Sequence, residues 1–273
     1  MKRDLTVAEQ LLFSTIKVET ASGTGTGFFL DYTIGDKHVP VFCTNRHVLN
    51  DNPEEPVSFR VHLDADTIEE METVQINLTS HWVFHPDEDL AVCFAAPLFQ
   101  GVEEKFGKRV FCRTIDESLI ARNDFLSELD ALEKVTMVGY PLGLSDEMHG
   151  LPIFRKGYTA SHPALDFNGT HRGLMDIAGL PGSSGSPIFI FNQNAFADRH
   201  GNINVGGVRL SLIGIQVAIP IMNATGTITV RETPTQQQVV AETRIPTNLA
   251  YYIKAEELLW FKAIVEKAIS NEG

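Results

Sequence analysis

The sequence predicts an all-β protein built as β-barrels or sandwiches. Most of its 273 residues fall into short apolar runs separated by Gly, Asn, Asp and Pro, and the chain contains 21 Gly and 13 Pro. Residues 59–66 and 74–80 alternate apolar and polar side chains with period two, which is typical of half-buried strands. The runs show no βαβ alternation, so a parallel sheet covered by helices is not expected.

The first half of the chain predicts a strand-rich lobe. Residues 7–20 begin as a short helical turn and run into a strand, and residues 25–34 and 38–49 continue as strands around the polar turn IGDK. The run at 89–97 is apolar and bounded by acids and Pro, which fits a strand buried on both faces.

The second half repeats this pattern after an acid-rich stretch, which we expect to form a loop with a short helix. Residues 223–247 are polar and turn-rich and favour an extended hairpin or a mobile loop. The last segment carries apolar side chains at spacings near 3.6, which predicts an amphipathic helix that packs on a barrel. The expected division is a first lobe at 1–115, a connection at 116–134, a second lobe at 135–250 and a C-terminal helix at 251–273.

The composition argues against several classes of function. A formal net charge of −13 and a pI near 5.1 disfavour binding to nucleic acid or to an anionic membrane, because polyanions would be repelled. No apolar run approaches the roughly 18 residues that a membrane helix needs, and the N-terminus lacks a signal-peptide core. Neither nucleic acid nor membrane is therefore an expected partner.

Cysteine and histidine usage predicts no metal site. Cys43, Cys93 and Cys112 are odd in number and each lies in an apolar stretch, which favours buried free thiols and, without a leader, a reducing cytoplasm. The nine histidines form neither an HExxH pair nor a Cys/His cluster at zinc spacing. We expect no metal and no other cofactor.

The strongest local signal is PGSSGSP at 181–187, which an apolar strand follows directly. A nucleophilic serine needs its Oγ exposed on a tight turn while nearby N–H groups converge on the oxyanion. Gly182 and Gly185 permit such a turn around Ser184, and the amides of Gly182 and Ser184 are natural oxyanion donors. A Gly/Ser cluster alone is more typical of a linker or hairpin turn, but the flanking apolar sequence disfavours a linker.

His47 and Asp89 are the candidates for the base and its orienting acid. His47 ends the apolar run 39–45, and Asp89 directly precedes an apolar strand. A carboxylate at that point would fix the histidine tautomer and stabilise the imidazolium. Taken alone, each residue also fits a structural or solvated role, as in the acidic triplet 87–89, so their combination carries the hypothesis.

The chain order His, Asp, Ser discriminates between hydrolase classes. α/β-Hydrolases run Ser, acid, His and subtilisins run Asp, His, Ser. The GxSxG pattern is also absent around Ser184, because Gly185 follows the serine immediately. The order therefore favours the chymotrypsin-like arrangement.

Four stretches resemble the trypsin-like peptidases, and among them most closely the protease domain of the HtrA-type bacterial enzymes. They are GTGFFL with TNRHVL, DLAV, VTMVGYPLGL and MDIAGLPGSSGSP, in the order of the family. The resemblance implies two six-stranded antiparallel β-barrels with a C-terminal α-helix. It also implies a serine endopeptidase that hydrolyses a protein or peptide substrate through an acyl-enzyme.

Carried onto this chain, the resemblance implies His47 as general base and acid, Asp89 as its orienting carboxylate and Ser184 as nucleophile. The oxyanion would be bound by the amides of Gly182 and Ser184, with Ser183 as a further donor. Residues 214–220 resemble the strand that pairs with the substrate backbone and walls the primary specificity pocket. The implied substrate-binding positions are Ala178, Gln216, Val217, Ala218 and Ile219.

Departures from the family pattern limit what carries over. Ser183 replaces the aspartate that pairs with a newly cut N-terminus in digestive enzymes, and no IVGG-like site is present, so zymogen cleavage of that type is not expected. Val48 replaces the cysteine of their histidine-loop disulfide. The chain ends after the expected helix, which leaves no room for the PDZ domain of many HtrA-type enzymes.

The specificity positions favour cleavage after a small or medium apolar residue. Ala178 stands where trypsins carry an acid that binds Lys or Arg, so a basic preference is not supported. Gln216 stands where glutamate-cleaving relatives carry a histidine, which argues mildly against an acidic preference.

Two further hypotheses stay open. The chain could be a catalytically silent or latent trypsin-like fold that acts as a protein-binding module, although all three triad residue types are present. It could also be a regulated effector that cleaves a single partner protein, with which residues 223–247 near the substrate wall are compatible. The sequence does not indicate the oligomeric state.

Overall fold

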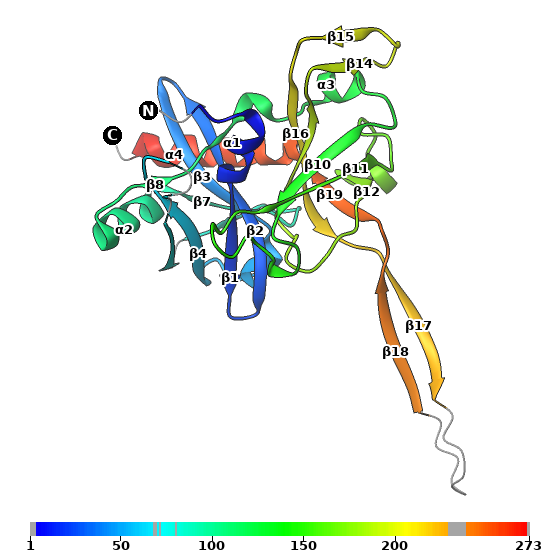
Figure 1. Cartoon of the computed structure of the whole chain (residues 1–273), viewed down its shortest axis with the longest axis horizontal. Coiled ribbons are helices and arrows are strands. Elements are labelled where there is room, and N and C mark those ends of the chain that lie inside the picture. Colours follow the sequence, from blue (N-terminus) through cyan, green and yellow to red (C-terminus); the bar gives the residue numbers. More distant parts are fainter. Residues whose placement is uncertain (1–3, 68–69, 71, 80, 229–238, 272–273) are drawn as a thin grey trace, which may run out of the picture.

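The computed structural model describes residues 4–67, 70, 72–79, 81–228 and 239–271, and it shows two β-rich lobes with a helix at the C-terminal end (Figure 1). The predicted all-β fold class with a C-terminal helix is confirmed. The α-helices are α1 (Val7–Ser14), α2 (Ala96–Phe106), α3 (Asn123–Ser127) and α4 (Leu259–Asn271). The 3-10 helices are η1 (Arg46–Leu49), η2 (Glu117–Leu119), η3 (Pro141–Gly143), η4 (Phe167–Gly169) and η5 (Ala255–Leu258).

The first lobe is a nine-stranded sheet in the order β5-β4-β1-β2-β3-β7-β6, with β8 on β4 and β9 on β2. Three of its strands, β6, β8 and β9, are only two residues long, so the six longer strands correspond to the six expected for a barrel. The strands are β1 (Thr15–Thr20), β2 (Gly23–Ile34), β3 (Lys37–Thr44), β4 (Pro56–Leu63), β5 (Thr73–Thr79), β6 (Val83–Phe84), β7 (Ala91–Phe94), β8 (Val110–Phe111) and β9 (Ile115–Asp116).

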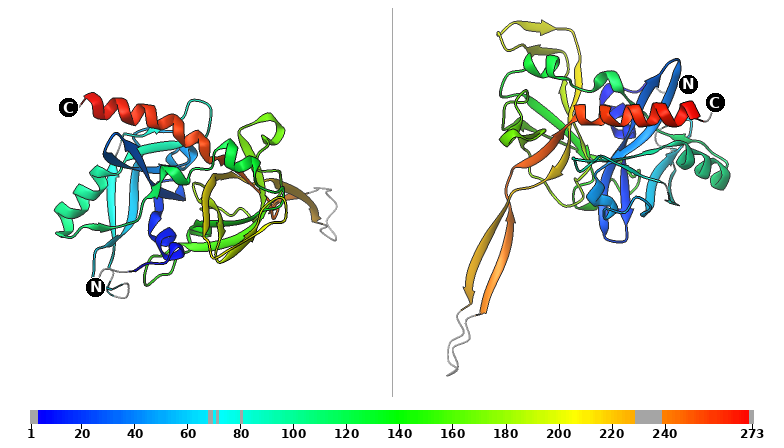
Figure 2. Two further views of the ribbon diagram at one scale, coloured as in Figure 1. Left: turned by 90° about the horizontal axis from the view of Figure 1, so that it is seen from above. Right: turned by 180° about the vertical axis from the view of Figure 1, so that it is seen from behind.

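The second lobe is a closed six-stranded barrel in the order β10-β11-β12-β19-β16-β13. Two hairpins are inserted between its strands, β14–β15 and β17–β18, and the second projects as a long arm away from both lobes (Figures 1 and 2). The strands are β10 (Lys134–Gly139), β11 (Ile153–Thr159), β12 (Arg172–Asp176), β13 (Pro187–Asn192), β14 (Ala195–Ala197), β15 (Ile203–Val205), β16 (Arg209–Ala218), β17 (Ile221–Ile228), β18 (Val239–Pro246) and β19 (Ala250–Lys254).

Local sequence explains how the first lobe begins. Thr6 and Glu9 form a capping box, in which each side chain bonds to the backbone amide of the other, and this fixes the start of α1. The core of this lobe contains Phe42, whose ring meets Phe59 and Trp82 edge to face. Burial of each such phenylalanine side chain stabilises the lobe by roughly 1.5–3 kcal/mol.

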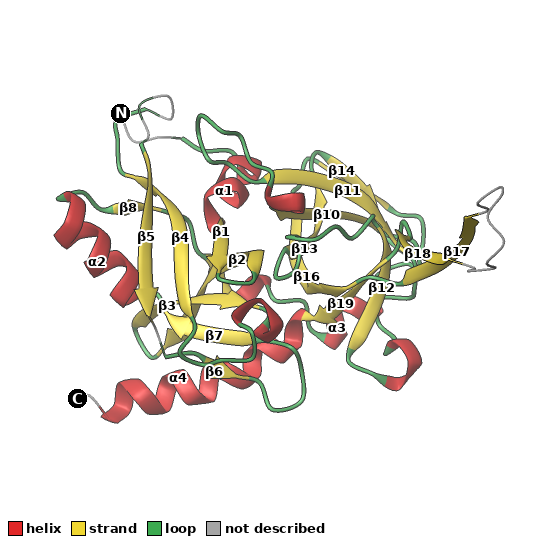
Figure 3. Ribbon diagram, turned by 90° about the horizontal axis from the view of Figure 1, so that it is seen from below, coloured by secondary structure: helices red, strands yellow, loops and turns green. Residues whose placement is uncertain are grey.

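A second core joins the two lobes and the C-terminal helix. Phe28 from β2, Phe189 from β13 and Phe261 from α4 are all fully buried in it. The Tyr32 hydroxyl donates a hydrogen bond of 2.6 Å to the carbonyl of Leu258, which also ties the first lobe to the chain entering α4. Seen from below, α4 runs along the first lobe beside β6 (Figure 3). The prediction that this helix packs on a barrel is confirmed.

Other expected elements lie near their predicted places. The stretch 116–134 contains η2 and α3, as expected for a loop with a short helix. Of the segment 223–247, the paired strands β17 and β18 form an extended hairpin, and 229–238 lie outside the described residues. The helix begins later than predicted, because 251–258 completes the barrel strand β19 and forms η5. The domain limits drawn from the sequence stay predictions.

The three cysteines are free thiols. Cys43 and Cys93 are buried, whereas Cys112 is half-buried and burial raises its pKa to about 11. Within the described part of the chain, no helix has both the length and the apolar character required to span a bilayer.

Candidate active site

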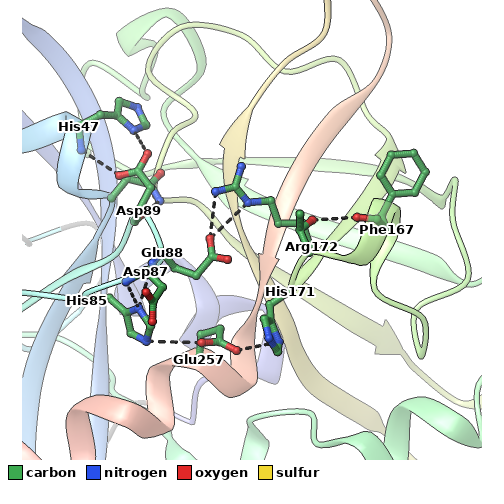
Figure 4. A network of polar contacts seen from close by, with 11 residues as sticks. His47, His85, Asp87, Glu88, Asp89, Phe167, His171, Arg172 and Glu257 are labelled. Carbon is green, nitrogen blue, oxygen red and sulfur yellow. Dashed lines mark hydrogen bonds and ion pairs between the residues drawn. The ribbon is translucent and has the colours of Figure 1, made fainter.

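His47 and Asp89, both in the first lobe, form a hydrogen-bonded pair (Figure 4). His47 lies in η1, directly after β3, and its imidazole Nδ1 is 2.6 Å from Asp89 Oδ2. Its backbone amide donates to the other carboxylate oxygen, Oδ1, at 3.0 Å. Because an ionised carboxylate only accepts hydrogen bonds, Nδ1 carries the proton and Nε2 is left as an acceptor.

The Asp89 carboxyl is held in its ionised form. Burial raises its pKa, but the side-chain hydrogen bond and electrostatic attraction of His47, together with the His47 amide and Arg46, outweigh burial and lower the pKa overall. Asn45, which is fully buried, fixes the backbone there by donating from its side-chain amide to the Asp89 carbonyl at 2.7 Å. The geometry is that of a histidine oriented by an acid.

Ser184 lies on a tight turn between two glycines with left-handed backbone, each at φ +87°. A Cβ at Gly182 would lie 2.5 Å from the Tyr140 carbonyl oxygen, and one at Gly185 would lie 2.0 Å from the Thr26 carbonyl oxygen. Only glycine therefore fits these two positions. The sequence predicted that a turn carrying a nucleophile needs flanking glycines. In this structure the reason is steric, because a carbonyl oxygen approaches each glycine closely.

Two of the three expected oxyanion donors are unpaired. Within the described residues, the backbone N–H groups of Gly182 and Ser184 donate to no protein acceptor. The Ser183 amide donates instead to the Leu180 carbonyl at 3.0 Å, inside the turn, so in this structure it is not free for the role expected of it. The arrangement can present two N–H groups to a developing negative charge.

Thr26 of β2 connects the turn to the first lobe, and sequence reasoning did not identify it. Its amide donates to the Ser184 carbonyl and its hydroxyl to the Gly182 carbonyl, each at 2.8 Å. The same hydroxyl accepts from the Tyr140 amide at 3.0 Å. Thr26 is fully buried. Its place between the two glycines of GTGFF was the only sequence signal.

Thr44 links this turn to β3, the strand that precedes His47. Its hydroxyl donates to the Thr26 carbonyl at 2.8 Å, and a Cβ at Gly185 would also lie 2.8 Å from that hydroxyl. Thr44 is the last residue of β3, directly before Asn45 and the helix that contains His47. The structure thus places the Ser184 turn against the end of β3. Within the described part of the chain, however, no hydrogen bond joins Ser184 Oγ to His47, a contact that often tightens only when substrate binds.

The expected substrate wall adjoins the turn through its backbone. The Gly185 amide donates to the Gln216 carbonyl at 2.9 Å, and the Gln216 amide donates to the Ser186 carbonyl at 3.0 Å. Along β16 and beyond it, Gln216 and Val217 are buried, and Ala218 is exposed. Ile219 is half-buried and packs against the core of the second barrel.

The region of Ala178 is narrow and lies beside a cation. A Cβ at Gly179 would lie 1.9 Å from Ile219 Cγ2, so the isoleucine side chain packs directly against the loop that follows β12. The Ala178 carbonyl accepts a hydrogen bond from the Arg155 guanidinium. Burial lowers the pKa of Arg155.

An ion pair between the lobes lies next to Asp89 and was also missed. Glu88 is buried, and its carboxylate accepts from Arg172 of β12 at 3.0 and 3.2 Å (Figure 4). Beside it, the His85 ring accepts from the Glu88 amide and approaches Glu257, which also pairs with His171. Within the described residues, no group of three or more His, Cys, Asp or Glu side chains could hold a metal ion.

Comparisons with known proteins found likenesses among solved structures. The sequence matches no protein-family profile and no curated protein. Among solved structures, it is similar to an inactive form of Rv3671c from M. tuberculosis (TM-score 0.45, 13% identity, 94% of this chain and 88% of that chain). It is also similar to an inactivated protease paralogue of the scabies mite (0.48, 12%, 94% and 96%) and to the serine protease AL20 of an extremophilic microorganism (0.44, 14%, 89% and 91%). These likenesses concern the fold alone.

Proposed function

We propose that the chain is a serine endopeptidase of the trypsin-like kind, with His47, Asp89 and Ser184 as its triad. The observation that carries the proposal is the ionised Asp89 bonded to His47 beside a glycine-bounded Ser184 turn that has two unpaired amides. Its relation to the HtrA-type enzymes rests on the four sequence stretches. A reducing compartment such as the cytoplasm is part of the proposal and is supported by the free thiols.

The proposed reaction is acyl transfer. Ser184 Oγ attacks the peptide carbonyl while His47 Nε2 takes the hydroxyl proton, and Asp89 stabilises the imidazolium that forms. The oxyanion is bound by the Gly182 and Ser184 amides. His47 then protonates the leaving amine, and water hydrolyses the acyl-enzyme by the same steps in reverse.

Labelling with a fluorophosphonate probe tests this proposal. The wild-type protein should be labelled, and Ser184→Ala should lose the label while it keeps the folded circular-dichroism spectrum. Ser186→Ala is the matched control, because Ser186 is a buried serine two residues away whose Oγ has no hydrogen-bond partner in the described part of the chain. Retained labelling of Ser184→Ala would refute the assignment.

One alternative is a silent or latent fold that binds a partner protein. It is supported by the observation that, within the described residues, His47 bonds to Asp89 but not to Ser184 Oγ. A wild-type protein that stays unlabelled, alone and with candidate partners, would favour this alternative.

We further propose that cleavage follows a small apolar residue. The Ile219 side chain fills space against Gly179, where a larger substrate side chain would have to enter. The Arg155 cation beside Ala178 disfavours a substrate Lys or Arg by like-charge repulsion. Peptide-library profiling should show Ala or Val before the scissile bond, and Ile219→Gly should extend the range to larger apolar residues. Predominant cleavage after Lys, Arg or Glu by the wild-type enzyme would contradict this specificity.

A further inference from the structure

A polar pocket that the proposed mechanism does not use opens beside the loop after β10. It is lined by Lys17 of β1, Arg60 of β4, and Gly143, Leu144, Ser145 and Glu147 of the loop. Lys17 has only 14% of its side chain exposed, and Arg60 is half-buried. Two partly buried cations therefore share one pocket on a chain whose net charge is −13.

The two cations face each other in the sheet. Lys17 and Arg60 are direct partners in the antiparallel pairing of β1 with β4. Like charges directly opposite on neighbouring strands destabilise a sheet, so the stability of the sheet does not explain why these two cations are paired. Glu19 compensates Lys17 through an ion pair of 2.7 Å. The Arg60 guanidinium has no carboxylate partner among the described residues, and it is the free cation in the pocket.

Other charged groups around the pocket do not neutralise Arg60. Glu147 also lines the pocket, but it is exposed and forms no ion pair within the described residues. Asp146, the next acid in the loop, is paired with His149 at 3.2 Å. The pocket therefore keeps a guanidinium whose donors match the two oxygens of a carboxylate.

The pocket adjoins the oxyanion side of the Ser184 turn. The Leu142 amide donates to the Pro181 carbonyl, and a Cβ at Gly182 would lie 3.0 Å from the Gly143 nitrogen. A Cβ at Gly143 would in turn lie 3.8 Å from Lys17 Nζ. The β16 wall joins the same turn from Gly185. A peptide that pairs with β16 before its scissile bond would thus continue over Gly182 and Gly143 toward the two cations.

We propose that this pocket binds an acidic side chain of the substrate, roughly three residues after the scissile bond at about 3.3 Å per extended residue. This inference rests on the proposed function, because it assigns the pocket to the same substrate. Leu142 and Leu144, which are 59% and 54% exposed, provide apolar contacts along the path to it. The substrate class is a protein whose cleavage site has a small apolar residue before it and an acid shortly after it.

Peptide binding to Ser184→Ala protein tests the pocket without requiring catalysis. Three fluorescent alanine-rich decapeptides would be identical except for two adjacent residues near the C-terminal end, which are Glu, Gln or Lys. We expect the Glu peptide to bind about tenfold more tightly than the Gln peptide by fluorescence anisotropy, and the Lys peptide to bind most weakly. Raising the salt from about 50 to 500 mM should shrink the difference.

Three variants locate the effect. Arg60→Gln and Lys17→Gln should each reduce the preference for Glu, with Arg60→Gln the stronger, and Glu147→Gln should increase it. Lys156→Gln is the control, because it removes one exposed positive charge from β11, outside the pocket. Equal binding of the Glu, Gln and Lys peptides, or loss of the preference only in Lys156→Gln, would overturn the inference. Failure of the proposed function would give a different result, because the fluorophosphonate probe would then not label the wild-type protein.

Discussion

The two halves of the candidate active site are built in different ways. In the first lobe, His47 and Asp89 are fixed by side-chain chemistry, with two hydrogen bonds between them and a third from Asn45 to the Asp89 backbone. In the second lobe, the Ser184 turn is fixed by backbone geometry, because two glycines at φ +87° occupy positions with no room for a Cβ.

This difference separates what each half would contribute to the proposed catalysis. The His47–Asp89 pair sets the protonation state of the imidazole, which a substitution of the same shape can still change. The Ser184 turn sets a backbone shape, which a substitution that leaves every functional group in place can still disrupt. Contacts of Thr26 and the Glu88–Arg172 ion pair join the halves. Four predictions follow this division, from the largest expected effect to the smallest.

Asp89→Asn should have the largest effect, because it keeps the shape of the first half and changes its chemistry. The amide can donate to His47 Nδ1, which would then stabilise the wrong tautomer and leave no acceptor at Nε2. We expect kcat to fall roughly 10⁴-fold, as such a change does in the serine protease triad. The measurement is turnover of a quenched peptide with alanine before the scissile bond. A loss below about tenfold would indicate that Asp89 does not orient the base.

Gly185→Ala should destabilise the second half while it leaves all side-chain chemistry intact. The new Cβ would overlap the Thr26 carbonyl oxygen at 2.0 Å and force alanine into the left-handed region. Strain and overlap together should lower the free energy of unfolding by about 4 kcal/mol. Urea denaturation would measure it.

Gly35→Ala is the matched control for that substitution. Gly35 also has positive φ, at 59°, but a Cβ there meets nothing within 4 Å. It should cost only the strain, about 1–2 kcal/mol. Equal costs for the two variants would show that the close approach of Thr26 to the turn is not a constraint.

Thr26→Val should weaken the connection between the halves. The substitution keeps the volume but leaves the buried Tyr140 amide without an acceptor and the Gly182 carbonyl without a donor. We expect kcat/KM to fall about tenfold, with a matching fall in the rate of fluorophosphonate labelling. Thr26→Ser retains the hydroxyl and should restore most of both rates. If both variants behave alike, the hydroxyl does not position the turn.

The same division explains how much of the site could be predicted from sequence. The glycine-bounded turn of Ser184 could be identified from its own residues, whereas His47 and Asp89 could be identified only in combination, from their chain order with Ser184 and the apolar strands beside them. Thr26 was missed because its role depends on contacts with residues more than a hundred positions later, which no local pattern records. Glu88 was missed for the same reason. It belongs to an acidic triplet that fits a solvated loop, and only the second lobe supplies its partner, Arg172.

The fold, like the site, could be predicted only in part. Period-two patterns and turn residues indicated the strands, but not that β19 would continue the barrel before the helix. Residues 251–254 have helix-compatible spacing, but pairing of β19 with β12 and β16 decided their conformation, and the 3-10 helix η5 follows at 255–258. Strand pairing across the barrel outweighs local periodicity, because it satisfies the backbone groups of a buried segment.

The smallest predicted effect concerns the pH dependence of stability. It distinguishes the His47–Asp89 pair, whose contribution depends on pH, from the Ser184 turn, whose contribution does not. Burial raises the pKa of Asp89, but His47 and Arg46 lower it overall, so the unfolded chain binds its proton more readily than the folded one. The ionised carboxylate therefore stabilises the fold above its unfolded pKa of about 3.9, and this contribution is lost as the pH falls through the lower folded value. The difference in unfolding free energy between wild type and Asp89→Asn should shrink as the pH falls from about 5 to 3. The cost of Gly185→Ala should stay constant over the same range, because its cause is steric. A pH-dependent cost for Gly185→Ala would show that the turn and the His47–Asp89 pair are coupled rather than built independently.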